Sequence, residues 1–198
     1  TTDWDTFYGA AETYADILGE KGLAVYRRLA EAEWAKMPQL KTGQTDRAYY
    51  GRRFRVTSIM EALASAEGDV EKLVSVKSRD LSSAYRFLEI AEVYKEAGDL
   101  DKALEWAEKG LKAFPENTDS RLREFLANEY HRRKKHSEAM QLIWADFADH
   151  PGLENYKTLK KHADRARQWP KWRQQALDYI RNEIAEAKKP APKDYSYW

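Results

Sequence analysis

The sequence lacks cysteine and has no long apolar run, although it extends over 198 residues. Without cysteine the chain forms no disulfide, has no thiol nucleophile and binds no cysteine-ligated zinc. No uninterrupted apolar stretch approaches the ~18 residues that cross a bilayer. The chain also begins at Thr1 without a signal peptide, so we expect a cytoplasmic piece of a longer protein.

An excess of charge of one sign is also missing. The chain has 34 Lys and Arg residues against 33 Asp and Glu residues, which gives a formal net charge of +1. A balanced chain creates no overall field that attracts nucleic acid or a membrane surface. The only basic region is 151–198, which has 11 Lys and Arg residues against 6 Asp and Glu residues.

Motifs for catalysis are absent as well. There is no glycine-rich phosphate loop and no Gly-x-Ser-x-Gly nucleophile motif. The chain has four histidines, His131, His136, His150 and His162. No two of them have the spacing of metal ligands with a glutamate nearby. We therefore predict that the chain is not an enzyme and binds neither a metal nor a cofactor.

The sequence is rich in helical periodicity instead, and it predicts an all-α fold. The expected helices cover residues 5–18, 21–36, 53–66, 70–77, 82–97, 100–113, 118–133, 137–148, 153–167 and 171–187. Gly68-Asp69 and Gly98-Asp99 each place a C-cap glycine before an N-cap aspartate. We expect an N-terminal hairpin and loop (1–50), helical repeats (51–187) and an extended tail (188–198).

An internal repeat organises the middle of the chain. When Pro115 is aligned with Pro151, a shift of 36 residues, similar residues coincide at positions where paired helices would touch. The coinciding pairs are Ile90 with Leu126, Ala91 with Ala127, Tyr94 with Tyr130, Ala103 with Ala139, Leu104 with Met140, and Leu111 with Phe147. Small residues let the helices of a hairpin approach closely, and large ones fill the space toward the next hairpin. We therefore expect Ala91, Ala103, Ala127 and Ala139 to be buried.

These residues resemble the tetratricopeptide repeat at its own spacing. The first copy matches at Phe87, Ile90, Ala91, Tyr94, Gly98, Ala103, Ala107 and Pro115, and the second at Leu126, Ala127, Tyr130, Ala139 and Pro151. Gly110 stands where alanine is usual, and Lys134 replaces the usual turn glycine. Weaker copies lie near 55–76 and 153–187. The resemblance implies antiparallel hairpins stacked as a tetratricopeptide-like right-handed solenoid.

Several stretches also resemble the helical region of bacterial SWIM zinc-finger proteins. They are residues 14–23 (YADILGEKGL), 53–55 (RFR), 79–83 (RDLSS), 122–127 (LREFLA) and 169–173 (WPKWR). In that family a cysteine- and histidine-bearing zinc motif, thought to bind nucleic acid or proteins, precedes the helices. The motif is missing from this chain, so its zinc-finger function does not carry over.

In tetratricopeptide arrays the first helix of each hairpin lines a concave face. The corresponding outward positions predict a partner-binding groove formed by Tyr85, Leu88, Glu92, Lys95, Arg121, Glu124, Asn128, His131, Arg132, Lys157 and Lys160. Mixed charge beside apolar side chains suits an extended peptide or a helix. An ordinary solvated helix face would have a similar pattern.

Two other features allow a binding or a structural interpretation. The basic run 131–136 could meet phosphate, or it could place cations at a helix C-terminus, where they interact favourably with the dipole. Trp169, Trp172 and Tyr179, with basic neighbours, could stack on bases or close the end of the hydrophobic core. The structural interpretation is favoured for both features.

The sequence as a whole predicts a non-enzymatic protein-interaction module inside a larger bacterial protein. Its expected partner is a protein or peptide segment bound on the concave face of the helical array. The alternative is an auxiliary nucleic-acid-binding surface that uses the basic C-terminal half, where nucleic acid would be reached as part of the parent protein. The sequence does not identify the partner.

Overall fold

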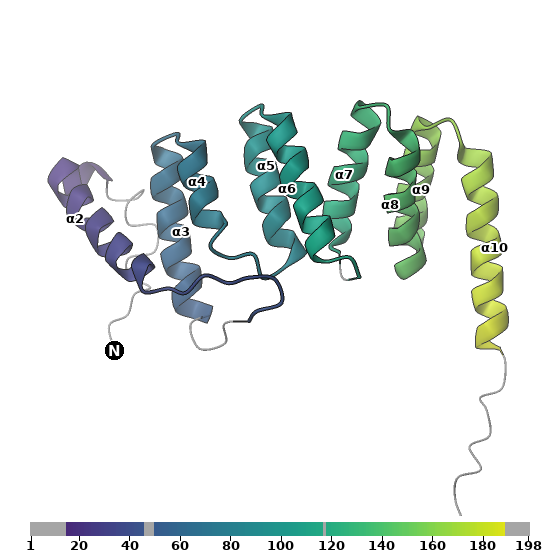
Figure 1. Ribbon diagram of the computed structural model, residues 1–198, viewed down its shortest axis with the longest axis horizontal. Coiled ribbons are helices and arrows are strands. Elements are labelled where there is room, and N and C mark those ends of the chain that lie inside the picture. Colours follow the sequence, from purple (N-terminus) through teal and green to yellow (C-terminus); the bar gives the residue numbers. More distant parts are fainter. Residues whose placement is uncertain (1–14, 46–49, 117, 189–198) are drawn as a thin grey trace, which may run out of the picture. The chain divides into compact units, whose positions relative to one another are not determined.

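The structure is a computed structural model that describes residues 15–45, 50–116 and 118–188. Over these ranges the chain is helical, without a strand, and an isolated β-bridge joins Leu40 to Asp80 (Figure 1). The helices are α2 (Ala15–Ala35), α3 (Tyr50–Ala66), α4 (Val70–Lys77), α5 (Ala84–Glu96), α6 (Leu100–Ala113), α7 (Ser120–Arg132), α8 (His136–Asp149), α9 (Leu153–Arg165) and α10 (Trp169–Ala187). The predicted all-α class is confirmed. None of these helices combines the length and apolar character needed to cross a membrane.

Most predicted helices are found within a few residues of their expected ends. The break predicted between residues 18 and 21 is present within α2, where two helical segments meet at a kink. The kink lies at Gly19, whose φ of 57° and ψ of −177° are not helical. Residues 5–14 of the first predicted helix and residues 189–198 of the predicted tail lie outside the described residues.

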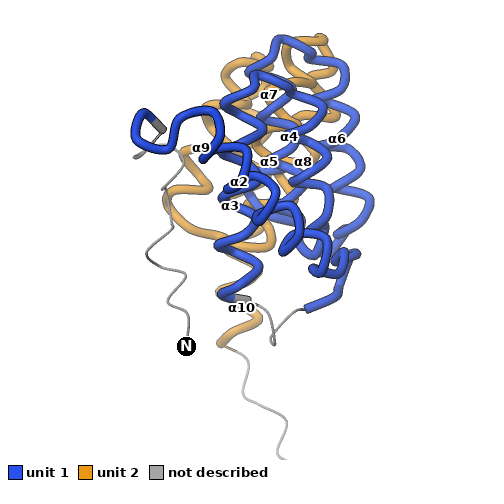
Figure 2. The backbone as a smooth tube through the Cα atoms, turned by 90° about the vertical axis from the view of Figure 1, so that its left-hand side faces the viewer, with its two compact units in different colours: residues 1–122 blue, residues 123–198 orange. Residues whose placement is uncertain are grey.

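The chain divides into two compact units, Thr1–Leu122 (unit 1) and Arg123–Trp198 (unit 2), and the boundary falls inside α7 (Figure 2). This division does not coincide with the domain limits expected at residues 50 and 187. Within unit 1, each helix from α2 to α6 packs against the next one along the chain. In unit 2, α8 packs against α9, and α9 packs against α10. Apart from the long segment between α2 and α3, the connections between these neighbours are short.

Apolar faces of successive helices form the core of each unit. In unit 1, a cluster joins α2, the loop that follows it, α3 and α4 through Ala30, Trp34, Met37, Val56, Ile59, Met60, Leu63 and Val76. In unit 2, the corresponding cluster contains Ala127, Ala139, Met140, Ile143, Phe147, Leu159, Ala163, Trp172 and Ala176. Trp169 and Tyr179 pack against this second cluster, which agrees with a core role for the C-terminal aromatic residues.

Alanines at the predicted contact positions are fully buried. Ala91, Ala103, Ala127 and Ala139 have no exposed surface, so this prediction is confirmed. The helix ends repeat at the shift found in the sequence, because α7 begins 36 residues after α5 (84 to 120) and α8 begins 36 residues after α6 (100 to 136). The residues that follow α6 and α8, Phe114 and His150, also have similar backbone angles.

Gly110 allows α6 to lie unusually close to its neighbours. A Cβ atom added at this position would be 2.6 Å from the Cβ of Phe87 and 2.9 Å from a methyl carbon of Leu122. The Phe87 contact involves an atom bonded directly to its own backbone, so rotation of the side chain does not relieve it. The departure from the usual alanine therefore has a steric cause.

We expect Gly110→Ala to destabilise the chain by about 1–2 kcal/mol. Alanine favours a helix over glycine by ~1 kcal/mol, but overpacking typically costs about 1–3 kcal/mol and prevails here because the obstruction is close to the backbone. Gly51→Ala is the matched control, since a Cβ at exposed Gly51 of α3 meets nothing within 4 Å. In urea unfolding, Gly110→Ala should have a lower free energy of unfolding than wild type, and Gly51→Ala a higher one. Equal stabilisation of both would disprove the close packing at Gly110.

The turns between paired helices use a left-handed residue, which is not always glycine. Gly68 and Gly98 have φ values of 68° and 83°, and the aspartates that follow them accept hydrogen bonds from the backbones of Lys72 and Lys102. At the equivalent turn before α8, Lys134 adopts a φ of 61°. The lysine thus preserves the turn geometry at a conformational cost of about 1–2 kcal/mol.

Replacing Lys134 by glycine should stabilise the chain by about 0.5–1 kcal/mol. Glycine removes the conformational cost of a positive φ at this position. It also increases the conformational entropy of the unfolded chain, which lowers the free energy of unfolding by about 0.4–1 kcal/mol. The free energy of unfolding in urea measures the difference. Lys134→Ala, which removes the charge but retains Cβ, should remain near wild type. If alanine stabilised the chain as much as glycine, the gain would come from charge and not from backbone strain.

Candidate functional site

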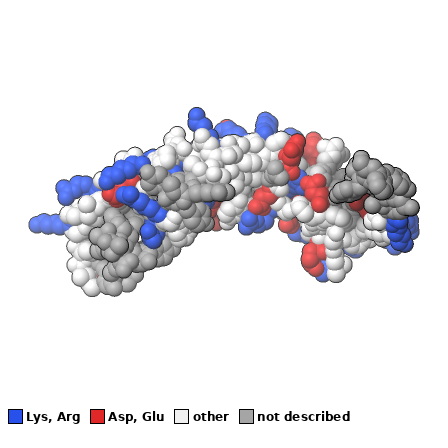
Figure 3. Space-filling view, turned by 90° about the horizontal axis from the view of Figure 1, so that it is seen from below, with Lys and Arg blue, Asp and Glu red and all other residues white. Residues whose placement is uncertain are grey.

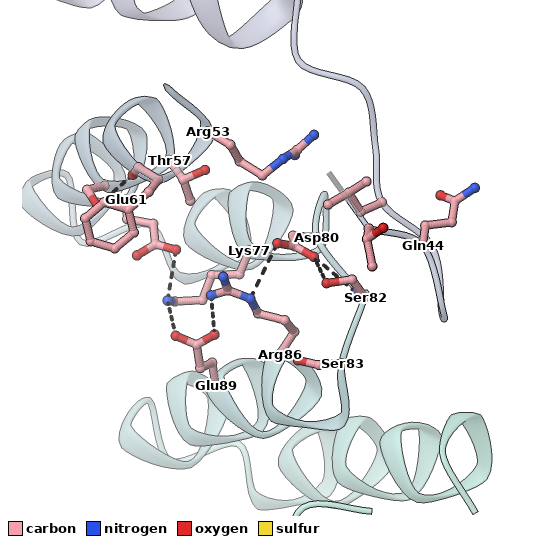
Figure 4. Close-up of a pocket in the computed structure, with 14 residues that line it drawn as sticks. Gln44, Arg53, Thr57, Glu61, Lys77, Asp80, Ser82, Ser83, Arg86 and Glu89 are labelled. Atoms are coloured by element: carbon pink, nitrogen blue, oxygen red, sulfur yellow. Dashed lines mark hydrogen bonds and ion pairs between the residues drawn. The ribbon is translucent and has the colours of Figure 1, made fainter. Parts of the chain in front are cut away.

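A cleft of about 660 Å³ opens in unit 1 between α3 and α5 (Figure 4). Its walls come from five consecutive parts of the chain: the loop 40–45, α3, the end of α4, the linker 78–83 and the start of α5. Side chains distant in sequence therefore meet in one hollow. We take this cleft as the candidate functional site.

The loop after α2 is held across the linker after α4 by backbone hydrogen bonds. The amide of Leu40 donates to the carbonyl of Arg79 at 2.8 Å, and the amide of Leu81 donates to the carbonyl of Leu40 at 2.8 Å. The buried Arg53 of α3 donates to the carbonyl of Pro38 at 2.7 Å. Arg79 donates to the Met37 carbonyl, so two arginines fix the start of the loop.

A chain of ion pairs forms the inner wall of the cleft. The ammonium of Lys77 lies 3.0 Å from the carboxylate of Glu61 and 3.7 Å from that of Glu89. The guanidinium of Arg86 lies 2.8 Å from Glu89 and 3.5 Å from Asp80 (Figure 4). Two cations alternate with three carboxylates and thereby join α3, α4 and α5. The cations and carboxylates of the inner wall are therefore already paired with one another.

Electrostatics keep Arg86 charged. Burial acts to lower its pKa, but the hydrogen bond to Glu89 and the charges of Glu89 and Asp80 outweigh burial and raise the pKa above its usual value. Asp80 also accepts hydrogen bonds from the hydroxyl and the amide of Ser82, at 2.6 and 3.1 Å. These contacts fix the linker at the base of α5.

The mouth of the cleft is more adaptable than its inner wall. Phe54 is 57% exposed although it is aromatic, and Gln44 and Ser83 are exposed polar residues at the opening. The lining residues include neither histidine nor cysteine, and the inner carboxylates already pair with cations. Such an arrangement can hold a polar chain with an apolar side chain against Phe54, but it offers no activated nucleophile.

The structure places the predicted groove residues of unit 1 outside this cleft. Tyr85 of α5 lies beneath the guanidinium of Arg121, whose carbon is 4.1 Å from the ring centroid. Glu92 and Lys95 are exposed farther along α5. Leu88 is only 2% exposed, which corrects the prediction that it lines a groove. Its side chain fills the core because α5 buries this face between its neighbours.

In unit 2 most predicted groove residues contact neighbouring side chains of their own unit. A set of polar contacts joins α7 to α9: Glu124 with Lys161 at 2.8 Å, and Asn128 with Arg165 at 3.3 Å. The exposed cations Arg132, Lys157 and Lys160 pair with Glu129, Glu154 and Asp164, respectively. The pairing of Arg132 and Arg133 with buried Glu129 supports a structural role for the basic run at the end of α7.

His131 is the second groove prediction that needs correction, because it is 3% exposed and belongs to a buried histidine cluster. Its Nδ1 atom lies 2.7 Å from Nδ1 of His136, and its ring stacks on that of His162 at a centroid distance of 5.2 Å. One of the two Nδ1 atoms must donate and the other accept, so both rings cannot be fully protonated while this contact exists. Within the described ranges, no group of three or more acidic or histidine side chains has metal-binding geometry.

Acid should destabilise the chain through this cluster. Burial, followed by the charges of His162, Arg165 and His136, lowers the pKa of His131 from 6.5 to about 4. Burial also lowers the pKa of His162. Because the folded pKa lies below the unfolded one, the unfolded chain takes up protons first as the pH falls. The free energy of unfolding keeps its full value above about pH 6.5 and declines from there to about pH 4. At pH 5 it should be lower than at neutral pH by about 1–2 kcal/mol.

Urea unfolding at pH 7.5 and pH 5.0 measures this loss. His131→Leu should reduce the difference between the two pH values, whereas His150→Gln, at an exposed histidine, should leave it unchanged. An undiminished difference in His131→Leu would show that the acid sensitivity arises elsewhere.

Comparison of the sequence with protein-family models and with curated proteins found no match. The resemblance to the helical region of SWIM zinc-finger proteins therefore remains a prediction. Two of the stretches that carry it, 53–55 and 79–83, contribute residues to the cleft or to the contacts that shape it. Arg79 and Asp80 lie between two predicted helices, but nothing in the sequence indicated that they would meet the loop 40–45.

Proposed function

We propose that the chain is a non-enzymatic protein-interaction module that binds an extended peptide segment of a partner protein in the cleft between α3 and α5. The observation that carries the proposal is the cleft itself, with its paired charges inside and its exposed aromatic residue at the mouth. A peptide offers backbone hydrogen-bonding groups to the polar lining and one apolar side chain to Phe54.

The proposed architecture is a tetratricopeptide-like array. Its support is the 36-residue recurrence of helix ends and the burial of small residues where paired helices meet. In such an array α3 and α5 are the first helices of successive hairpins, which are the helices that bind partners. The cleft lies between these two helices, on unit 1 alone.

Charge balance favours a peptide over a polyanion. The inner wall contributes Lys77 and Arg86 against three carboxylates, so it offers no surplus of cations to a phosphate backbone. In unit 2, Lys157 and Lys161 are likewise held in ion pairs with carboxylates. These observations weigh against the nucleic-acid alternative, and none of the described contacts favours it.

Capture of partners by the parent protein tests the proposal, with Phe54→Ala and Ser83→Trp as cleft variants. The first removes the exposed aromatic side chain, and the second fills the mouth. Ser83 precedes α5 but its side chain makes no capping hydrogen bond, so the second change removes no cap of that helix. We expect both variants to lose the partner at least about tenfold, which corresponds to about 1.4 kcal/mol. Helix content and melting temperature should stay near wild type.

The matched control is Glu105→Ala with Lys109→Ala, which removes an exposed ion pair on α6. It should retain the partner. Lysates should be compared with and without nuclease, because a nucleic-acid partner would disappear on digestion and at raised salt. Retention of the partner by both cleft variants, or its loss after nuclease treatment alone, would contradict the proposal.

A further inference from the structure

The outward face of α2 is apolar and exposed. Val25 and Leu29 are one helical turn apart and are 46% and 55% exposed. Leu18 is 36% exposed and belongs to the same face despite the bend at Gly19, because a Cβ placed at Gly22 would lie 2.9 Å from the Cβ of Leu18. Leu18, Gly22, Val25 and Leu29 therefore form a continuous strip, which we call the α2 strip.

The core does not use this strip. The opposite face of α2 packs on α3 through Tyr26, Ala30 and Trp34, so the helix already has a buried side. Exposed helix faces normally carry polar residues, since exposed apolar surface promotes association. The α2 strip departs from this pattern over about three turns.

α10 of unit 2 provides an internal comparison. It also packs against the preceding helix, α9, but the exposed residues of its first three turns are, apart from Pro170, polar or charged: Lys171, Arg173, Gln174 and Asp178. Ile184, farther along α10, is a single exposed apolar residue and forms no strip of this kind. The apolar character of the α2 strip is therefore not a general property of the helices in this chain.

Positive charge borders the strip. Lys21 lies four residues before Val25 and Arg28 three residues after it, so both are neighbours of Val25 on the helix surface. Both side chains are exposed and form no ion pair within the described residues. In the view of Figure 3, lysine and arginine side chains predominate at the end of unit 1 formed by α2 and α3, which lies at the left.

We propose that the α2 strip is a docking surface, separate from the cleft, for an amphipathic helix of a partner protein whose apolar face is bordered by Asp or Glu. The partner's apolar side chains cover Leu18, Val25 and Leu29, and its carboxylates face Lys21 and Arg28. The flanking charges determine which helices bind, and apolar burial provides most of the affinity.

A second copy of the chain is a poorer fit to the same surface. Two α2 helices related by a twofold axis in antiparallel orientation place each flank against its own counterpart. Lys21 and Arg28 would then face the same cations of the other copy, which is unfavourable. An acidic flank removes this repulsion.

Two synthetic helical peptides that share one Leu/Val strip, one flanked by Glu and one by Lys, test the proposal by fluorescence anisotropy with the full 198-residue chain. Wild type should bind the Glu-flanked peptide at least about tenfold more tightly than its Lys-flanked twin, and the preference should shrink as salt is raised. Val25→Gln with Leu29→Gln should abolish binding of both peptides. Lys21→Glu with Arg28→Glu should reverse the preference.

Matched controls lie on unit 2. Leu153→Gln with Ile184→Gln changes two other exposed apolar residues, and Lys171→Glu with Arg173→Glu makes the same charge change on α10. Both should behave as wild type, and circular dichroism should show unchanged helix content in every variant. Equal affinity for the two peptides, or binding that survives the change at Val25 and Leu29, would overturn the proposal. A dimer in light scattering that the same two changes dissociate would also overturn it, because the occupant would then be a second copy.

Discussion

Between α5 and α6, Ala91, Ala103 and Ala107 have no exposed surface, and at Gly110 even a methyl group would overlap Phe87. This close approach of paired helices is the constraint on which the rest of the structure depends. When two helices nearly touch, large apolar side chains cannot lie between them and must pack toward the next helix in sequence. Leu88 shows the consequence, since it is buried although tetratricopeptide geometry assigned it to a groove.

Close packing also determines where charge can be placed. Glu129 is 1% exposed and is held by Arg132 and Arg133, while Arg123, 5% exposed, lies 2.6 Å from Asp149. A buried ion without a partner would be very unfavourable, so these groups are tied to their own helix or the adjacent one. Charges that the fold has paired in this way are poorly available to a ligand. The cleft is different in geometry, because a loop held by backbone hydrogen bonds to the linker after α4 forms one of its walls and leaves a hollow of mixed apolar and polar lining.

The sequence predicted those features of the fold that depend on residues close together in the chain, namely helix ends and helix contact positions. Helical periodicity and the Gly-Asp pairs placed α4 and α6 at their observed ends, and the repeat identified the buried alanines. The cleft was not predicted, because it depends on contacts such as Leu40 with Arg79 that join residues far apart in the chain. The burial of His131 was missed for a similar reason. Helical spacing places it on an outward face, and the rings of His136 from α8 and His162 from α9 cover it. The sequence showed that Lys134 replaces the usual turn glycine, and the structure shows that it nevertheless adopts the left-handed conformation.

The two units differ in how well local preference agrees with the fold. In unit 1 the turns use Gly68 and Gly98 and are followed by capping aspartates, so sequence and conformation agree. In unit 2 the corresponding turn residues are Lys134 and Arg167 at positive φ, and α8, α9 and α10 begin without a side-chain cap. Its core also encloses histidine nitrogens that have no hydrogen-bond partner among the described residues. Unit 1 is not free of such features, since α5 also begins without a side-chain cap and Arg79 Nε is buried without a hydrogen-bond partner among the described residues. The difference between the units therefore lies in the turn residues, where unit 1 uses glycine and unit 2 accepts the conformational cost of lysine and arginine at positive φ. The histidine cluster adds a dependence on acid that belongs to unit 2.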